Sequence, residues 1–286
     1  MKFKSTFFSL ATILIFAVCG FSQERRIADD NAMTDHLRKE GVRYETKRAI
    51  VWAEKDSLTQ AEIEEFGKLA NQGIIDIEKY SGIKFDKKHF KADKIEYFLS
   101  SKVDIAHASA EGKPYLYIRP IRVKQKKSMY LHETTHIIDW NSLKPMWLHE
   151  GFPNYIQTYV SRHYGGYHGS VFNPENKPID EMARNHLKEE ISKRVLPLIG
   201  RNGTPYDFNV TEAEWKIYSF ILEDRQVAAP AFYNLSESFV KFIVEKVGMK
   251  KMRKILEPQD TRAAIEKVTG KNMDEWKTDW LKSLAK

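Results

Sequence analysis

Two neighbouring polar motifs constrain the fold of this chain more than any other feature. The first is HETTH within "YLHETTHIIDW" at 130–140, and the second is "MWLHEGFPNYIQTY" at 146–159. Histidines four residues apart lie on the same face of a helix, so His132 and His136 can point at one ion. Glu133 is rotated by about 100° from His132, which places its carboxylate beside such an ion. We therefore predict a helix over 128–140 that carries part of a metal site.

The second motif supplies a third candidate ligand, Glu150. The segment after His136 is long enough for one helix to end, for the chain to turn through "NSLKP", and for a second helix over roughly 147–161 to run back alongside. A catalytic zinc ion takes three protein ligands and keeps a fourth position for water. We therefore predict that His132, His136 and Glu150 bind one Zn²⁺ per chain. His149 is a competing third ligand, and a helix with a polar exposed edge is the alternative to a metal site.

Together the two motifs resemble those of the gluzincin metallopeptidases, in which HExxH is followed by W-L-x-E-G-x-A-x-Y on the next helix. The short gap and the small chain are most similar to the compact, peptidase MA-like (minigluzincin) branch, and the resemblance covers about residues 46–286. It implies a zincin-like α+β fold, with the active site between an N-terminal lobe built on a small mixed β-sheet and a mainly helical C-terminal lobe. It also implies that Glu133 is the general base that takes a proton from the zinc-bound water, and that the zinc ligands are His132, His136 and Glu150.

Three residues outside this set also bear on the site. The resemblance implies that Tyr233, ahead of a long amphipathic helix, donates to the oxyanion of the tetrahedral intermediate; a core tyrosine is the alternative. Asp139 can support an imidazole N–H, or it is a surface carboxylate near the helix end. Pro153 replaces the family's small residue and cannot donate a helical hydrogen bond. We therefore expect the second helix to start near Gly151 or to be kinked there.

Other polar residues are weaker candidates. His163 and His168, in "RHYGGYHG", can line the cleft, but we expect them in a surface loop. Glu111, in "SAEGK", is similar to an amine-binding glutamate of aminopeptidases, but we expect a solvated turn. Glycosylation sequons begin at Asn202, Asn209 and Asn234.

The first 22 residues have the layout of a secretory signal peptide. A basic start precedes an apolar run over 7–19, and small residues precede a cleavage site after Ser22. The run is too short for a finished membrane span. The chain has one cysteine, Cys19, where lipidation is the alternative to cleavage and release. We expect a secreted or periplasmic protein without disulfides and without a membrane span in the mature chain.

The remaining chain divides into a polar N-terminal arm over 23–45, an α/β lobe over 46–127 and a helical lobe over 128–286. In the α/β lobe a helix over 57–82 has a capping box between Thr59 and Glu62 and ends at Gly82. Strands are expected over 48–53, 94–101 and 114–123. Further helices are expected near 180–194 and over 211–225, 234–248, 249–257, 261–270 and 273–285.

A zinc-dependent metallopeptidase acting on a peptide or protein substrate is the function that these features favour. The net charge is +7 and the charges are mixed along the chain, so we expect no nucleic-acid partner. The strand over 114–123 precedes the motif helix, and its edge can pair with an extended peptide. One alternative is a binding module that keeps zinc for stability. Another is a zinc hydrolase of a non-peptide amide, such as cell-wall material.

Overall fold

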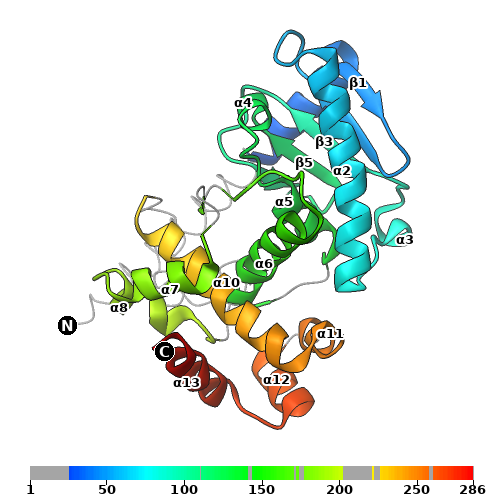
Figure 1. Ribbon diagram of the computed structural model, residues 1–286. Helices are drawn as coiled ribbons and strands as arrows, with labels where there is room; N and C mark the ends of the chain where they lie inside the picture. Colours follow the sequence, from blue (N-terminus) through cyan, green and yellow to red (C-terminus); the bar gives the residue numbers. More distant parts are fainter. Residues whose placement is uncertain are drawn as a thin grey trace, which may run out of the picture.

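The computed structural model describes residues 26–109, 111–140, 144–170, 172–173, 177–201, 221, 226–257 and 260–285. Over these residues the fold is α+β, with a small mixed sheet followed by a series of helices (Figure 1). The signal peptide expected over 1–22 lies outside the described residues, as does all but Ile221 of the helix expected over 211–225. Among the described helices, none combines the length and the apolarity that a membrane crossing requires.

The sheet has five strands in the order β1-β2-β3-β5-β4. The central strands β2, β3 and β5 are parallel, and β1 and β4 are antiparallel at the two edges. The sequence predicted the three central strands but neither edge strand. It also placed a free edge on the strand over 114–123, which is wrong, because β5 is paired on both sides. The strands are β1 (Val42–Glu45), β2 (Ala49–Ala53), β3 (Ile95–Leu99), β4 (His107–Ala108) and β5 (Tyr115–Ile118).

The strand expected to reach residue 123 ends early. β5 stops at Ile118, and a short helix, α4 (Pro120–Lys124), follows it directly. Pro120 occupies the first turn of that helix, where its missing N–H is not needed and its fixed φ favours helical geometry. Pro120 and Val123 are buried. The apolar residues that suggested a longer strand therefore contribute to the core as part of a helix.

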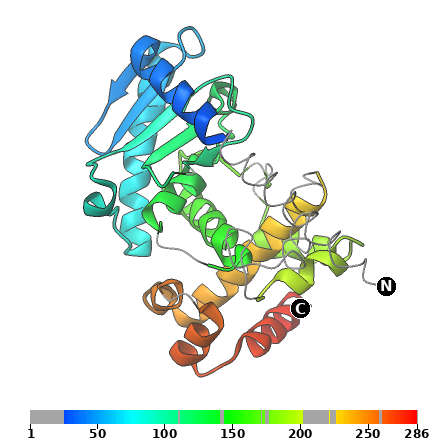
Figure 2. The ribbon, with the colours of Figure 1, turned by 180° about the vertical axis from the view of Figure 1, so that it is seen from behind.

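Helix α2 (Gln60–Ser81) confirms the predicted helix of the first lobe. The capping box between Thr59 and Glu62 is present, and Gly82 ends the helix in the left-handed conformation. α2 covers one face of the sheet, where Val51 and Leu116 belong to the main core. Figure 2 shows a second helix, in dark blue, across the opposite face.

This second helix spans residues 26–40 and corrects the expectation of a polar arm over 23–45. Met33 and Leu37, one turn apart, are buried against Phe98 and Tyr117 of the sheet. Ion pairs and hydrogen bonds reinforce the packing; for example, Thr34 Oγ1 lies 3.0 Å from Tyr117 Oη. The chain then continues into β1. Burial of two apolar residues, together with these polar contacts, therefore holds an otherwise polar segment against the sheet.

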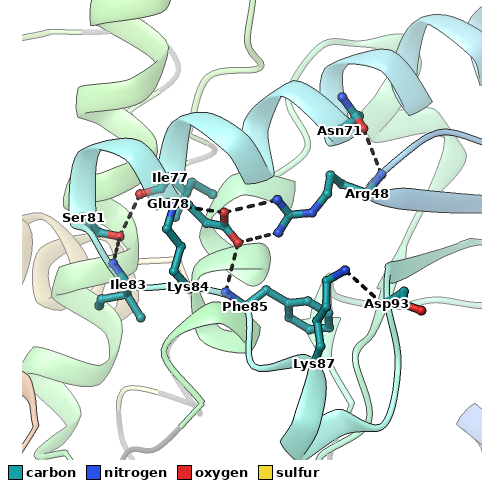
Figure 3. A network of polar contacts seen from close by, with 10 residues as sticks. All are labelled: Arg48, Asn71, Ile77, Glu78, Ser81, Ile83, Lys84, Phe85, Lys87 and Asp93. Atoms are coloured by element: carbon teal, nitrogen blue, oxygen red, sulfur yellow. Dashed lines mark hydrogen bonds and ion pairs between the residues drawn. The ribbon is translucent and has the colours of Figure 1, made fainter.

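A buried ion pair ties α2 to the sheet (Figure 3). Arg48, just before β2, donates hydrogen bonds from both terminal guanidinium nitrogens to the Glu78 carboxylate. The same carboxylate accepts a hydrogen bond from the Phe85 backbone N–H at 3.0 Å. Burial alone would raise the pKa of Glu78. The hydrogen bonds from Arg48 and Phe85 lower the pKa by more than burial raises it, so the net shift is downward.

Glu78→Gln is expected to cost about 3 kcal/mol of unfolding free energy at pH 7, at the low end for a broken buried pair because Arg48 keeps some solvent contact. The pKa of Glu78 is lower in the folded than in the unfolded protein. Its contribution is therefore complete above the unfolded pKa and is lost as the pH falls through the folded pKa. Urea unfolding from pH 7 downward should show the gap between the two proteins closing below about pH 4.5. The exposed Lys87–Asp93 pair provides the control, since Asp93→Asn should cost less than about 1 kcal/mol.

The second half of the described chain is helical. The helix expected near 180–194 consists of two shorter helices, α7 and α8, and the helix expected over 234–248 begins earlier, at Ala228. The last three expected helices are confirmed. The helices are α3 (Lys87–Phe90), α5 (Tyr130–Ile138), α6 (Met146–Tyr164), α7 (Ile179–Leu187), α8 (Ser192–Val195), η1 (Leu196–Leu198), α10 (Ala228–Val247), α11 (Met249–Leu256), α12 (Thr261–Thr269) and α13 (Met273–Leu284).

Candidate metal centre

Helix α5 carries the HETTH motif between the sheet and the helices that follow it (Figure 1). Nearly all of its side chains are buried, which is unusual for a helix with so many polar residues. The polar residues have partners: Thr134 and Thr135 donate to backbone carbonyls one turn earlier, and the Tyr97 hydroxyl on β3 lies 2.8 Å from Thr134 Oγ1. The sheet thus fixes one side of α5 and leaves the histidine side facing α6.

Helix α6 runs from Met146 to Tyr164 with Pro153 inside it. The helix predicted over roughly 147–161 is therefore confirmed; of the two effects expected of Pro153, a start near Gly151 is wrong, and a kink stays a prediction. Pro153 cannot donate to the carbonyl of His149, but the helix continues on either side of it. Gly151 lies against α10, where a Cβ would come within 2.8 Å of the Ser236 backbone. This close approach positions Glu150, the neighbour of Gly151, on the α5 side.

Three side chains from α5 and α6 converge at one point. His132 Nε2 lies 3.0 Å from His136 Nε2 and 3.2 Å from Glu150 Oε2. The third side of the triangle, between His136 Nε2 and Glu150 Oε2, is 3.7 Å. Zinc bonds of about 2.0–2.1 Å at tetrahedral angles separate neighbouring ligand atoms by about 3.3 Å. The triangle of two imidazole nitrogens and one carboxylate oxygen is therefore small enough to hold a metal ion.

His132 is oriented by two residues of α6, Asn154 and Gln157, that were not predicted from the sequence. His132 Nδ1 lies 2.8 Å from Asn154 Oδ1, and the His132 backbone N–H donates to Gln157 Oε1 at 3.0 Å. A proton on Nδ1 leaves the lone pair of Nε2 directed at the centre. Both amides lie on α6, at one and two turns beyond Glu150. That spacing was the available signal for them.

The electrostatics of the group favour a bound cation. Burial alone would raise the pKa of Glu150, but hydrogen bonds from His132 and His136 outweigh it and hold the pKa well below its usual range. Burial opposes the charged form of His132, yet its contact with Glu150 raises its pKa. A divalent cation takes the place of the proton that such groups share. The buried group His132, His136 and Glu150 can therefore hold a metal ion.

Glu133 is buried beside the ligand group but is not part of it. Burial raises the pKa of its carboxyl, and the neighbouring imidazoles of His132 and His136 lower that pKa by a smaller amount. His107 of the edge strand β4 is also within electrostatic reach of Glu133. Glu133 is therefore within electrostatic reach of both histidines of the metal group, and its place beside a bound ion stays a prediction.

The other proposed site residues lie close to the centre with different partners. Tyr233 lies on α10 rather than ahead of it; its ring centroid is 6.1 Å from that of His132 and 4.3 Å from that of Phe172, on which it stacks. Asp139 ends α5 and forms an ion pair with Lys144. Support of an imidazole by Asp139 stays a prediction, whereas Asn154 provides that contact for His132.

His149, the competing ligand, lies on the outer side of Glu150. Its Nε2 is 3.9 Å from Glu150 Oε1, whereas His132 and His136 approach the other carboxylate oxygen, Oε2; its ring centroid is 4.4 Å from that of His136. Burial, together with the neighbouring His136, lowers its pKa to about 3. His149 is thus a neutral neighbour of the metal group.

The weaker sequence candidates lie elsewhere. Glu111 is exposed and pairs with Lys113, and His163 is exposed and stacks on Tyr159. His168 is buried, contrary to expectation, with Nδ1 2.9 Å from Ser128 Oγ. Asn234 is buried too, so the sequon there is inaccessible in the folded chain. The sequons at Asn202 and Asn209 lie outside the described residues.

The chain matches no model of a known protein family, and no curated protein matches it in sequence.

Proposed function

We propose that this protein is a zinc-dependent metallopeptidase of the gluzincin type. The observation that carries the proposal is the triangle of His132, His136 and Glu150, with Glu133 beside it. Among the described residues, no fourth histidine, cysteine, aspartate or glutamate joins the group. A structural zinc site is closed by four protein ligands, whereas a catalytic one keeps a position open. The ligand set therefore favours catalysis over a module that keeps zinc only for stability.

A zinc ion bound here supplies a Lewis acid that polarises the substrate carbonyl and lowers the pKa of water. Glu133 accepts the proton of the attacking water and later delivers it to the leaving amine. Its buried carboxyl has a raised pKa, which suits a group that must both take and give a proton near neutral pH. Asn154 keeps the proton of His132 on Nδ1 throughout.

The edge strand β4 is the place for an extended substrate. It is paired with β5 on one side, and no other described strand pairs with it. It also contacts α5, the helix that carries the HETTH motif. An extended peptide that adds to this edge makes main-chain hydrogen bonds along β4 and passes beside the metal group. This favours a peptide over another amide as the substrate class.

Tyr233→Phe is expected to lower kcat by about 10²-fold to 10³-fold, because it removes one hydroxyl donor to the oxyanion. The Tyr233 ring is near His132, and its stacking on Phe172 does not need the hydroxyl. Steady-state kinetics on a cleaved peptide, with metal content measured in parallel, provide the test. Full activity in the variant would assign Tyr233 to packing alone. Loss of metal together with activity would also contradict a role confined to the oxyanion.

A further inference from the structure

We propose that the buried carboxyl of Glu237 is a positioning residue of the metal centre and acts on His132 through Asn154. The inference rests on the proposed metal site. Glu237 lies on α10, one turn beyond Tyr233, and only 2% of its surface is exposed. Its carboxyl accepts from the Thr158 hydroxyl on α6, while its Oε1 has no partner among the described residues. A carboxyl buried with a free oxygen is costly and calls for a functional explanation.

A matching free donor lies on α6. Asn154 is 1% exposed; its Oδ1 accepts from His132, and its Nδ2 has no partner among the described residues. The orientation of this amide follows from the site: when His132 Nε2 faces the ligand group, Nδ1 carries the proton and needs an acceptor. The amide N–H groups of Asn154 therefore point away from His132.

The two unpartnered groups belong to one interface. Gly151, Asn154 and Thr158 lie on one face of α6. Gly151 touches Ser236 and Thr158 touches Glu237, so residues on both sides of Asn154 contact consecutive residues of α10. Asn154 thus lies between two contact points with the segment that carries Glu237. Helices α6 and α10 also pack against each other along much of their length, as their many close contacts show.

One buried water between Asn154 Nδ2 and Glu237 Oε1 satisfies both atoms, which have no direct partner among the described residues. Hydrogen bonds in a buried chain polarise one another, so an amide that donates to a carboxyl is a better acceptor at its oxygen. The chain from Glu237 through Asn154 to His132 then strengthens the bond at Nδ1 and makes Nε2 a better metal ligand. Burial raises the pKa of the Glu237 carboxyl to about 8, because the charged form loses contact with water.

The test compares Glu237→Met with Glu237→Gln, in the wild-type background and in Asn154→Ala. Zinc affinity is measured by competition with a chromophoric chelator. Glu237→Met is expected to raise the zinc Kd by about 10–100-fold, the usual effect of losing such an outer partner, without lowering the melting temperature. Glu237→Gln keeps an acceptor oxygen and is expected to restore most of the affinity. In the Asn154→Ala background, Glu237→Met is expected to add little.

Ser238→Ala is the matched control, because Ser238 is a neighbouring buried residue of α10 that bonds Asp180 and Trp280 and not the centre. It is expected to lower the melting temperature and leave the zinc Kd unchanged. An unchanged Kd in Glu237→Met overturns the proposal, as does an equal penalty with and without Asn154.

A second readout does not need metal. In the metal-free protein, the Nδ1 proton of His132 is followed by nitrogen–proton NMR. Glu237→Met is expected to shift that signal upfield and Glu237→Gln to leave it near its wild-type position. If the wild-type protein binds no zinc, the proposed function fails, while this signal still decides whether Glu237 acts on His132. An identical signal in Glu237→Met overturns the inference.

Discussion

Glu150→Ala is expected to abolish stable zinc binding. Glu150 supplies the only carboxylate oxygen of the ligand triangle, at 3.2 Å and 3.7 Å from the two imidazole nitrogens. Its removal leaves two histidines, which do not complete the three-ligand set of a catalytic zinc. The affinity should fall by more than the ~10–100-fold that follows from loss of an outer partner. Elemental analysis after dialysis, with circular dichroism to verify folding, measures the effect.

His149→Ala is the control for this variant. His149 is adjacent in sequence and half-buried on the same helix, but its nitrogens do not join the ligand group. The variant is expected to retain zinc. If His149→Ala loses the metal and Glu150→Ala keeps it, the third ligand is His149 and the triangle described above is not the metal site.

Glu133→Gln is expected to retain zinc and to lower turnover by about 10²-fold to 10⁴-fold. The substitution keeps the size of a side chain that is buried beside the ligands, so folding and metal binding should be preserved. It removes the only group of the motif that can accept the water proton. Zinc content and peptide hydrolysis are measured on the same preparation. Loss of zinc from Glu133→Gln would make this residue a ligand, and undiminished turnover would place the base elsewhere.

The parts of the site that the sequence predicted depend on local spacing. His132 and His136 share a helix face because they are four residues apart, and the segment after His136 is long enough for a second helix to bring Glu150 back alongside. The capping box of α2 is likewise a short-range pattern, and it is present. Spacing from Glu150 was a signal for Asn154, but no spacing could place Glu237, which lies on the distant helix α10. Polar side chains on amphipathic helices normally face solvent, and only the packing of α6 against α10 turns these two inward.

The fold was less predictable where long-range packing decides. Residues 26–40 form a helix because the sheet offers Phe98 and Tyr117 to Met33 and Leu37, a contact between segments far apart in the chain. β4 has two residues, too few for any alternation to show, and it exists because β5 pairs with it. Pro153 predicted a helix boundary or a kink on local grounds. The helix is not interrupted there, because burial of the surrounding residues against α5 and α10 outweighs the lost hydrogen bond.

Cleavage of a peptide library, read by mass spectrometry, tests the proposed peptidase most directly. The zinc-loaded protein and zinc-loaded Glu133→Gln are incubated with the library in parallel. The wild-type protein is expected to produce new peptide termini that disappear with a chelator, return with added zinc, and are strongly reduced with Glu133→Gln. A wild-type digest identical to that of Glu133→Gln, with zinc bound to both proteins, would contradict hydrolysis of peptide bonds at this centre.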